Sequence, residues 1–524
     1  MSLSREETLH QISASDYNCD VLVIGGGATG LGAAVESASR GYRTLLIERD
    51  DFAKGTSSRS TKLVHGGVRY LEQFKIALVL DALRERGYML RNAPHLVHKL
   101  SFVVPAYSYG SLPYYGLGLK LYERLSGPLS LGKSEMLSAK ATQDILPTIS
   151  PSGLKGGILY WDGQFDDARY AIALMRTLQD LGGFALNYMG AQRLIQKKGR
   201  IAGVVAKDYD SGEESEIKAK VVINATGVFT DDIRHMDDAS TSPILTVSQG
   251  THFVLSSGFL PGKNALMIPR TADGRVLFAI PWHCRVVVGT TDEPVAKIST
   301  EPRSLELERN FLSEHIRHYI GKPLRAEDVL SMWSGLRPLV KRAGGGKTSA
   351  LLRDHTIFIS ASGLVTVTGG KWTTYRKMGE DTINLAAQTA GLAAAPSRTS
   401  HLKLHGWTEH RDPAASESDL QYGSDLPAIE AYAAEDARWN TLLHPRLPYR
   451  YREVLWAVRS EMARTVEDVL ARRTRALFLD ARAAIEAAPT VAQLMARELQ
   501  RDESWAAQSL TQFQQIADGY IYRD

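Results

Sequence analysis

The stretch DVLVIGGGATGLGAAVESASRGYRTLLIERD, residues 20–50, decides the fold. Its apolar run at residues 21–24 is typical of a buried parallel strand, and a glycine turn follows that run. An alanine-rich segment at residues 31–40 predicts a helix, and residues 44–47 predict a second strand. The stretch therefore predicts a strand–helix–strand unit within about thirty residues, which indicates an α/β fold.

The glycines of this turn have the spacing of a dinucleotide-binding fingerprint. Gly25, Gly27 and Gly30 form G-x-G-x-x-G between the predicted strand and the predicted helix. The first glycine permits the tight turn, the second lets a pyrophosphate approach the helix N-terminus, and the third permits close packing of helix on strand. Glu48 ends the second strand, where its carboxylate can accept hydrogen bonds from the adenosine ribose. The same carboxylate would repel the 2′-phosphate of NADP.

A second segment indicates which dinucleotide is bound. VVINATG, residues 221–227, is typical of another buried strand and ends at Gly227. Together with the N-terminal fingerprint, it resembles the two-segment FAD site of flavoproteins built like glutathione reductase and D-amino-acid oxidase. The sequence has no second G-x-G-x-x-G unit that would form a separate NAD(P)H domain. We therefore expect bound FAD that is reduced by a small substrate.

The composition of the whole chain argues against several classes of protein. The 524 residues are 44% hydrophobic and 23% charged, and the formal net charge of +4 gives no support to a nucleic-acid partner. Cys19 and Cys284 lack CxxC spacing, which favours a reducing compartment over a disulfide framework. No run of eighteen apolar residues occurs, residues 1–20 lack the apolar core of a secretory signal, and no cluster has metal-ligand spacing. We expect a cytoplasmic protein without a metal, with any membrane contact peripheral on the inner face of the cell membrane.

The order of predicted elements divides the chain into three units. A discontinuous FAD-binding domain is expected at residues 18–90, 150–235 and 335–395. An antiparallel β substrate-binding or cap domain is expected at residues 91–149 and 236–334. Short β-rich runs between residues 244 and 291 support this second unit. After AAAPSRTS the chain becomes rich in Ala, Arg and Glu with helical periodicity, so residues 397–524 are expected to form an all-helical C-terminal domain.

Four short motifs combine glycine with positively charged or titratable side chains. They are KLVHGGVRYLE (residues 62–72), SQGTHFVL (248–255), WSGLRPL (333–339) and GGKWTTYRK (369–377). An isolated arginine is usually a solvated surface charge, but such side chains beside glycine turns at several separate points indicate an anion site. A planar guanidinium matches the geometry of a phosphate, and lysine adds a point charge.

With these motifs, the sequence resembles the FAD-dependent (aerobic, respiratory) glycerol-3-phosphate dehydrogenase family. The segments that carry the resemblance are IGGGATGLGAA, TSSRSTKLVHGGVRYLE, YWDGQFDDARY, VVINATG, GTHFV, GTTD, SGLRPL and GGKWTTYRKM. They occur in the family's order between residues 21 and 378. The helical C-terminal part matches the family only in type.

The resemblance implies roles for particular residues. A substrate pocket beside the flavin would contain Arg69, Tyr70 and His65, with Arg353 on the phosphate side. The hydroxyl-bearing end of the substrate and the flavin would be surrounded by His252, Arg337 and Lys371. FAD, bound noncovalently, would be contacted by Thr56, Ser57, Ser58 and Lys62, by the backbone at Gly66 and Gly67, and by Gly227, Gly370, Thr373 and Thr374.

The implied reaction oxidises sn-glycerol 3-phosphate to dihydroxyacetone phosphate. A hydride leaves C2 for flavin N5 while the C2 hydroxyl loses a proton, and the electrons then pass to a membrane quinone. His252 is the expected base because the ordinary pKa of histidine lies near neutrality. Arg337 and Lys371 would stabilise negative charge on the oxygen or on the reduced flavin. A hydrogen-bonded structural histidine on a strand is the alternative role for His252.

Other functions share parts of this pattern. A glycerol-3-phosphate oxidase, which passes electrons to O₂ and forms peroxide, would carry every motif but usually has a sizeable extra insertion. An amino-acid or sarcosine-type oxidase would need one carboxylate-binding arginine, and a flavin-binding regulator without turnover would lack the cations beside the glycine turns.

Contact with a lipid surface is a separate hypothesis. Residues 107–127 mix aromatic and leucine side chains with cations, as interfacial segments do, and the arginine-rich residues 438–475 would attract anionic lipid. A packed cap-domain segment and a solvated helix face are the alternative readings. A homodimer is also compatible with the sequence.

Overall fold

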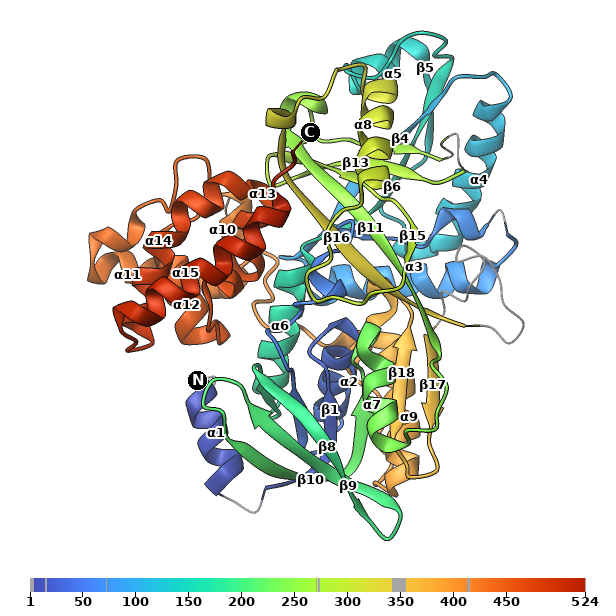
Figure 1. The fold of residues 1–524 in the computed structure, drawn as a ribbon. Helices are drawn as coiled ribbons and strands as arrows, with labels where there is room; N and C mark the ends of the chain where they lie inside the picture. The colour runs from blue at the N-terminus through green and yellow to red at the C-terminus, as the bar shows by residue number, and fades with distance from the viewer. Residues whose placement is uncertain are drawn as a thin grey trace.

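The computed structural model describes residues 4–14, 17–71, 73–269, 271, 274–341, 355–410, 412 and 415–523, without the side chain of Arg69. Within these residues, two β-sheets stand one above the other, and a helical unit packs beside them (Figure 1). The helical unit is formed by the C-terminal part of the chain. This mixed α/β architecture with a helical C-terminal part confirms the predicted fold class.

The lower sheet contains the predicted strand–helix–strand unit. Its strand order is β17-β18-β10-β1-β2-β7, and β1 runs parallel to both β10 and β2. Its strands are β1 (Asn18–Ile24), β2 (Thr44–Ile47), β7 (Phe184–Leu186), β10 (Glu214–Asn224), β17 (His355–Ile359) and β18 (Val365–Gly369), extended by β8 (Met189–Lys197) and β9 (Arg200–Asp208). Helix α2 (Ala28–Ser39) follows β1 and packs against α9 (Tyr375–Ala390). It begins earlier than predicted because Gly27, within the fingerprint, is its N-cap.

The upper sheet is mostly antiparallel, as predicted for residues 244–291. Its strands are β3 (Leu63–Val64), β4 (Val97–Ala106), β5 (Glu135–Ser138), β6 (Gly156–Phe165), β11 (Leu245–Ser256), β12 (Ala265–Ile268), β13 (Leu277–Trp282), β14 (Arg285–Gly289), β15 (Glu293–Val295) and β16 (Val329–Val340). Strands β3, β6 and the end of β16 belong here, although the expected boundaries placed them in the FAD-binding domain. The FAD-binding segments therefore enter the upper sheet directly.

Helices cover the sheets and build the C-terminal unit. Those before residue 330 are α1 (Arg5–Ala14), α3 (Ile76–Asn92), α4 (Ser111–Ser126), α5 (Ala139–Ile145), α6 (Asp167–Asp180), α7 (Thr230–Asp237) and α8 (Glu306–Ile320). The C-terminal unit contains α10 (Glu417–Leu420), α11 (Leu426–Glu435), α12 (Tyr451–Glu461), the π-helix η12 (Asp468–Arg473), α13 (Ala476–Leu479), α14 (Ala481–Glu498) and α15 (Glu503–Ala517). One hydrophobic core joins this unit to the upper sheet, where the rings of Trp333 and Phe478 lie 4.9 Å apart.

Buried ion pairs fasten the C-terminal unit to the loop after β2. Asp51 accepts hydrogen bonds from Arg472 at 2.5 Å and from Arg473 at 2.6 Å, and all three side chains are buried. Burial alone would raise the pKa of Asp51, but the two guanidinium groups outweigh burial and hold that pKa below its ordinary value. Lys54 is bonded to Glu467 at 2.5 Å beside them. Removing one partner of such a buried pair costs about 3–5 kcal/mol, so this contact fixes the loop that leads into the site.

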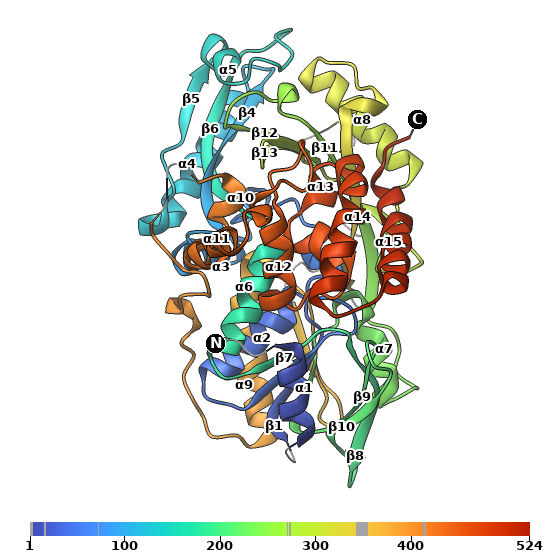
Figure 2. The ribbon, with the colours of Figure 1, turned by 90° about the vertical axis from the view of Figure 1, so that its left-hand side faces the viewer.

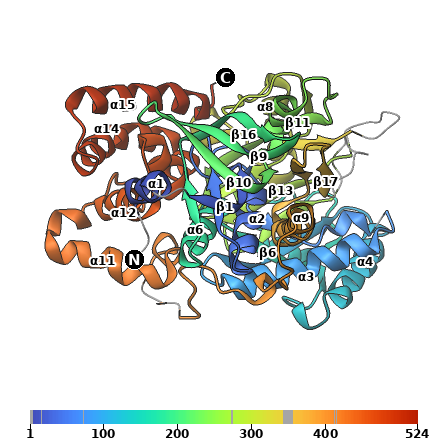
Figure 3. The same cartoon turned by 90° about the horizontal axis from the view of Figure 1, so that it is seen from below.

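The C-terminal unit also contacts α6 and the N-terminal helix. Figure 2 shows α12 beside α6, and Arg169 of α6 makes two hydrogen bonds of 2.7 Å to Glu461 at the end of α12. Figure 3 shows α1 against the same unit, where Arg464 bonds Glu6 at 2.7 Å. Among the described residues, no helix is both long enough and apolar enough to cross a membrane.

Candidate active site

The glycine fingerprint forms a turn that side chains larger than hydrogen would block. Gly25 has φ +114°, and a Cβ on Gly30 would lie 1.9 Å from the carbonyl oxygen of Gly25. Gly27 then begins α2, whose first backbone N–H, on Ala28, donates to Ser57 Oγ at 2.9 Å. This bond brings the short helix η1 (Thr56–Ser58) to the N-terminus of α2, which is where a pyrophosphate binds.

Glu48 lies at the end of β2 beside this turn. Its carboxylate accepts the Gly26 N–H at 2.6 Å and the Asp50 N–H at 2.8 Å. Burial raises the pKa of Glu48 to about 7. The carboxylate is thus held where the adenosine ribose of a dinucleotide would lie.

The remaining FAD-type turns come together next to α2. Gly227, with φ +60°, begins the turn after β10, and Gly370, with φ +73°, follows β18. Thr373 Oγ1 accepts the backbone N–H of His65 at 3.2 Å, and Trp372 Nε1 donates to Ser57 O at 2.8 Å. These bonds join the GGKWTTYRK segment to the KLVHGGVRYLE segment and to η1. The tight turn, the open helix N-terminus and the buried carboxylate fit an FAD molecule.

A cavity of about 1160 Å³ adjoins these turns and contains most of the predicted substrate residues. His65, Tyr70, His252, Arg337 and Lys371 all line it. So do Arg59, Lys75, Arg275, Thr61, Thr290 and Asp292, which the sequence interpretation did not assign to the site. Arg275 directly follows Gly274, so it has the same glycine-and-cation pattern, but it lies outside the four motifs on which the sequence interpretation was based. The cavity is wide and rich in cations, as a site for a phosphorylated substrate requires.

His252 occupies the centre of β11, between Gly289 of β14 and Trp333 of β16. Its ring stacks on Trp333 with centroids 5.2 Å apart and an interplanar angle of 15°, and a Cβ on Gly289 would lie 2.1 Å from its Cδ2. Its Nε2 is 2.9 Å from Thr61 Oγ1. Burial, with the positive charges of Lys62 and Arg337, holds the pKa of His252 well below its ordinary value. The lowered pKa favours the neutral imidazole, in which one ring nitrogen carries a lone pair.

Arg337 is fixed by groups on the neighbouring loop. Its Nη1 donates to Asp292 at 3.2 Å, and its Nη2 donates to the Thr290 hydroxyl and to the Thr291 carbonyl at 2.9 Å each. A Cβ on Gly250 would lie 2.1 Å from Arg337 Nη2, so glycine makes the space for the guanidinium. This geometry aims a fixed positive charge at the cavity.

Lys371 and Tyr70 contact each other in the lining of the cavity. The Nζ atom of Lys371 is 4.1 Å from the centre of the Tyr70 ring. A Cβ on Gly67, which has φ +77°, would lie 2.6 Å from that same ring, so the His-Gly-Gly turn requires glycine there. The N–H of Gly66 donates to the buried Tyr122 hydroxyl at 2.6 Å, which fixes the turn from behind.

The structure contradicts the role expected for Lys62. Its side chain is buried, and its nitrogen donates to both oxygens of Asp167 at 2.7 and 2.9 Å and to Ser58 O at 2.7 Å. Burial lowers the pKa of Lys62 to about 7, although Asp167 partly offsets that effect. No donor of this amine remains for an FAD phosphate. Its partner Asp167 lies 105 residues away, so local sequence gave no sign of this pairing.

Other predicted residues occupy less direct positions. Ser58 is buried with its carbonyl bonded to Lys62, and the hydroxyl of Thr374 donates to Lys371 O at 3.2 Å. The side chain of Arg69, and the whole of Arg353, lie outside the described part of the chain.

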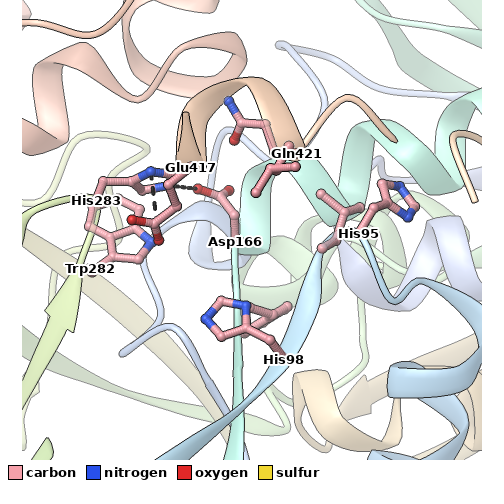
Figure 4. A pocket seen from close by; sticks show the side chains of 10 residues that line it. His95, His98, Asp166, Trp282, His283, Glu417 and Gln421 are labelled. Atoms are coloured by element: carbon pink, nitrogen blue, oxygen red, sulfur yellow. Dashed lines mark ion pairs between the residues drawn. The ribbon is translucent and has the colours of Figure 1, made fainter. Parts of the chain in front are cut away.

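A second cavity, of about 180 Å³, lies where α10 meets the upper sheet (Figure 4). His283 stands between Asp166, 3.7 Å away, and Glu417, 4.0 Å away, and Figure 4 draws both ion pairs. Burial would lower the pKa of His283, but Glu417 and Asp166 outweigh burial and raise it. This cavity contains none of the glycine motifs.

Comparison with known proteins agrees with this geometry. A family model described as FAD dependent oxidoreductase matches residues 20–376, and one described as C-terminal domain of alpha-glycerophosphate oxidase matches residues 382–506. The mitochondrial glycerol-3-phosphate dehydrogenase of Bos taurus is 41% identical over 518 residues, which are 93% of this chain and 71% of that protein. The corresponding protein of Arabidopsis thaliana is 37% identical over 559 aligned residues, 99% of this chain and 88% of the relative.

Solved structures show the same relationship. A glycerol-3-phosphate dehydrogenase from Bacillus halodurans, complexed with FAD, has a TM-score of 0.79 at 29% identity, covering 99% of this chain and 98% of that one. An L-alpha-glycerophosphate oxidase from Mycoplasma pneumoniae, with a TM-score of 0.57 at 17% identity, covers 73% of this chain and 97% of that one and shares the fold. The chain belongs to the FAD-dependent glycerol-3-phosphate dehydrogenase family, and FAD is its cofactor.

Proposed function

We propose that this protein oxidises sn-glycerol 3-phosphate to dihydroxyacetone phosphate. The observation that carries the proposal is the buried His252 in a cation-lined cavity beside the FAD turns. FAD supplies the acceptor for the hydride from C2. His252 takes up the proton of the C2 hydroxyl, and Arg337 stabilises the charge that develops on that oxygen. Lys371 and Tyr70 hold the substrate against the same wall.

The phosphate of the substrate is held by further cations of this cavity. Arg275 and Lys75 line it together with Lys371. Arg69 and Arg353 are proposed to join them, as the family resemblance implies. An amino-acid oxidase requires one carboxylate-binding arginine, so this distribution of charge favours a phosphorylated substrate.

The direct test is reduction of the bound flavin without oxygen. Glycerol 3-phosphate should bleach the visible flavin absorbance of the purified protein, and amino acids should leave it unchanged, because only a phosphate uses the cations of the cavity. Spectra of FAD-loaded protein before and after anaerobic addition give the answer. An unchanged spectrum with glycerol 3-phosphate would overturn the proposal and favour a flavin protein without turnover.

Reoxidation by a quinone analogue, without peroxide when air is admitted, distinguishes a dehydrogenase from an oxidase.

We further propose that electrons pass to a membrane quinone at an apolar patch beside this cavity. The apolar patch consists of Phe74, Tyr109, Tyr114, Leu117 and Leu121, whose exposed fractions are 87%, 75%, 59%, 74% and 46%. Three of these side chains belong to α4, which packs on α3. Lys75, directly after Phe74, lines the substrate cavity. The patch is thus close to the reaction site and suited to peripheral contact with a lipid surface on the cytoplasmic side.

Charges placed on the patch should prevent this contact. The double variant Leu117→Asp/Leu121→Asp should lose at least tenfold in binding to vesicles of anionic phospholipid, since burial of each leucine contributes about 1.5–3 kcal/mol. Flotation with vesicles measures binding, and activity with a soluble dye should stay unchanged while activity with vesicle-borne quinone falls. Leu307→Asp, which changes an exposed leucine on α8, is the control. Equal flotation of the double variant and this control would contradict the proposal.

A further inference from the structure

The two ring nitrogens of His252 have different surroundings. Nε2 lies 2.9 Å from the hydroxyl of Thr61, whereas Nδ1 is buried and meets no hydrogen-bonding atom of the described residues. Trp333 covers one face of the ring, and the backbone of Gly289 lies against its edge. A proton can therefore enter this imidazole at Nε2, and the atom already in place there is the Thr61 oxygen.

Thr61 also lines the large cavity, so its hydroxyl stands between the cavity and the buried histidine. We propose that Thr61 is a further catalytic residue, which passes the substrate's hydroxyl proton to His252. This inference rests on the proposed function, since it assumes that the substrate is an alcohol oxidised in this cavity. A hydroxyl is suited to the task because it accepts one proton while it donates another.

The proposed step conserves atoms and charge. The C2–H bond breaks and its electron pair leaves with the hydrogen as a hydride, which FAD accepts. The substrate O–H bond breaks, its proton moves to Thr61 Oγ1, and the original Thr61 proton moves to His252 Nε2. The C2–O bond becomes a carbonyl, and the imidazole becomes an imidazolium that later releases its proton to water. The relay requires the tautomer with hydrogen on Nδ1, which leaves the Nε2 lone pair facing Thr61.

The residues on both sides of Thr61 are bonded to one buried carboxylate. Asp167 accepts the Ser60 N–H at 2.9 Å, the Ser60 hydroxyl at 2.7 Å and the Lys62 amine at 2.7 Å. Arg475 donates to the same carboxylate at 3.1 Å and to Ser58 O at 2.9 Å. Because the residues before and after Thr61 are both held, its hydroxyl keeps a fixed direction toward His252.

Lys62 connects this carboxylate to the ring that supports His252. Its nitrogen lies 5.2 Å from the centre of Trp333, and also within 5.4 Å of the rings of Trp282 and Phe478. Lys62 and Asp167 are thus positioning residues, which place the hydroxyl and the stacked ring relative to each other. The charged groups that face Lys62 are Asp166, Asp167 and Arg475, and those that act on His252 are Lys62 and Arg337.

Thr61→Val removes the hydroxyl and keeps the shape of the side chain. Anaerobic stopped-flow measurement of flavin reduction by glycerol 3-phosphate should show a rate about 100-fold lower, with the substrate Kd within about threefold of wild type. Thr61→Ser, which restores the hydroxyl, should recover most of the rate. In the valine variant, the rate of flavin reduction should also rise with pH, because hydroxide then has to remove the substrate's proton. Thr389→Val, which removes a hydroxyl bonded within α9, is the control for a general effect on folding.

The flavin-reduction rate of Thr61→Val can contradict the relay. A reduction rate for Thr61→Val within threefold of wild type, with full FAD content, would overturn the relay. If the wild type bleaches with glycerol 3-phosphate and the valine variant matches it, the relay fails while the proposed function stands. If the wild type does not bleach, the function itself fails.

A measurement on the wild type keeps the test independent of any variant. The rate of flavin reduction is followed in mixtures of H₂O and D₂O. Two protons moving together, from substrate to Thr61 and from Thr61 to His252, should give a curved dependence on the deuterium fraction. A linear dependence would mean that one proton moves, directly to His252, and would overturn the relay.

Discussion

Replacing His252 with alanine is expected to slow flavin reduction by glycerol 3-phosphate by about 10²–10⁴-fold, which is the usual contribution of a positioned base. The substrate Kd should change by less than about threefold, because the histidine acts on the proton in the transition state and contributes little to holding the phosphate. Single-turnover reduction at several substrate concentrations separates the two quantities. FAD content should be unchanged, since among the described residues the hydrogen bond of this ring is to the Thr61 hydroxyl and not to a glycine turn.

The pH dependence of the wild type supplies the second part of this prediction. Burial and nearby positive charge hold the pKa of His252 well below its ordinary value. A base acts in its neutral form, so protonation of His252 should not lower the reduction rate between pH 8 and pH 6.5 and should do so only at lower pH, whereas a base with ordinary pKa would have lost half its activity near pH 6.5. His315→Ala, on α8, is the matched histidine control. A His252→Ala rate within threefold of wild type would favour a structural histidine instead.

Gly30→Ala is expected to give a colourless protein. The added Cβ would lie 1.9 Å from the Gly25 carbonyl oxygen, so the turn must open where the pyrophosphate of FAD binds. We expect FAD affinity to fall at least 100-fold, or about 2.7 kcal/mol. The ratio of flavin to protein absorbance after purification, followed by titration of the apoprotein with FAD, measures the loss.

The control for this variant is a glycine with space around it. A Cβ on Gly118, within α4, would meet no atom within 4 Å, so Gly118→Ala should bind FAD as the wild type does. A yellow Gly30→Ala protein with unchanged FAD affinity would contradict the geometry of the turn. A loss of secondary structure, detected by circular dichroism, would mean that the same clash disturbs the packing of α2 against β1.

The parts of the site that the sequence predicts well are those encoded locally. The spacing of Gly25, Gly27 and Gly30 specifies one turn between one strand and one helix, and Glu48 follows at the end of the next strand. Such geometry needs no knowledge of distant residues. His252, Arg337 and Lys371, expected near one another from the resemblance, line one cavity in the structure. Their chemical roles stay predictions.

The parts that sequence could not supply depend on contacts between distant segments. The family resemblance assigns Lys62 to FAD, but Asp167 is folded against it in the interior. Thr61 went unnoticed because threonine is common and its importance comes from the distance to His252, 191 residues away. The pairing of β6 with β4 in the upper sheet could not be predicted for the same reason, since it is not encoded within either strand alone.

The arginine pair of η12 also imposes an order on folding. Asp51 lies in the loop after β2, yet its partners Arg472 and Arg473 leave the ribosome 421 and 422 residues later. Until then this carboxylate stays hydrated, because an unpaired charge in the interior costs several kcal/mol. The loop after β2 can therefore take its buried position only once η12 has been made and has docked against it. We expect stable flavin loading to depend on this docking, although the nucleotide-binding residues lie far from η12 in the sequence.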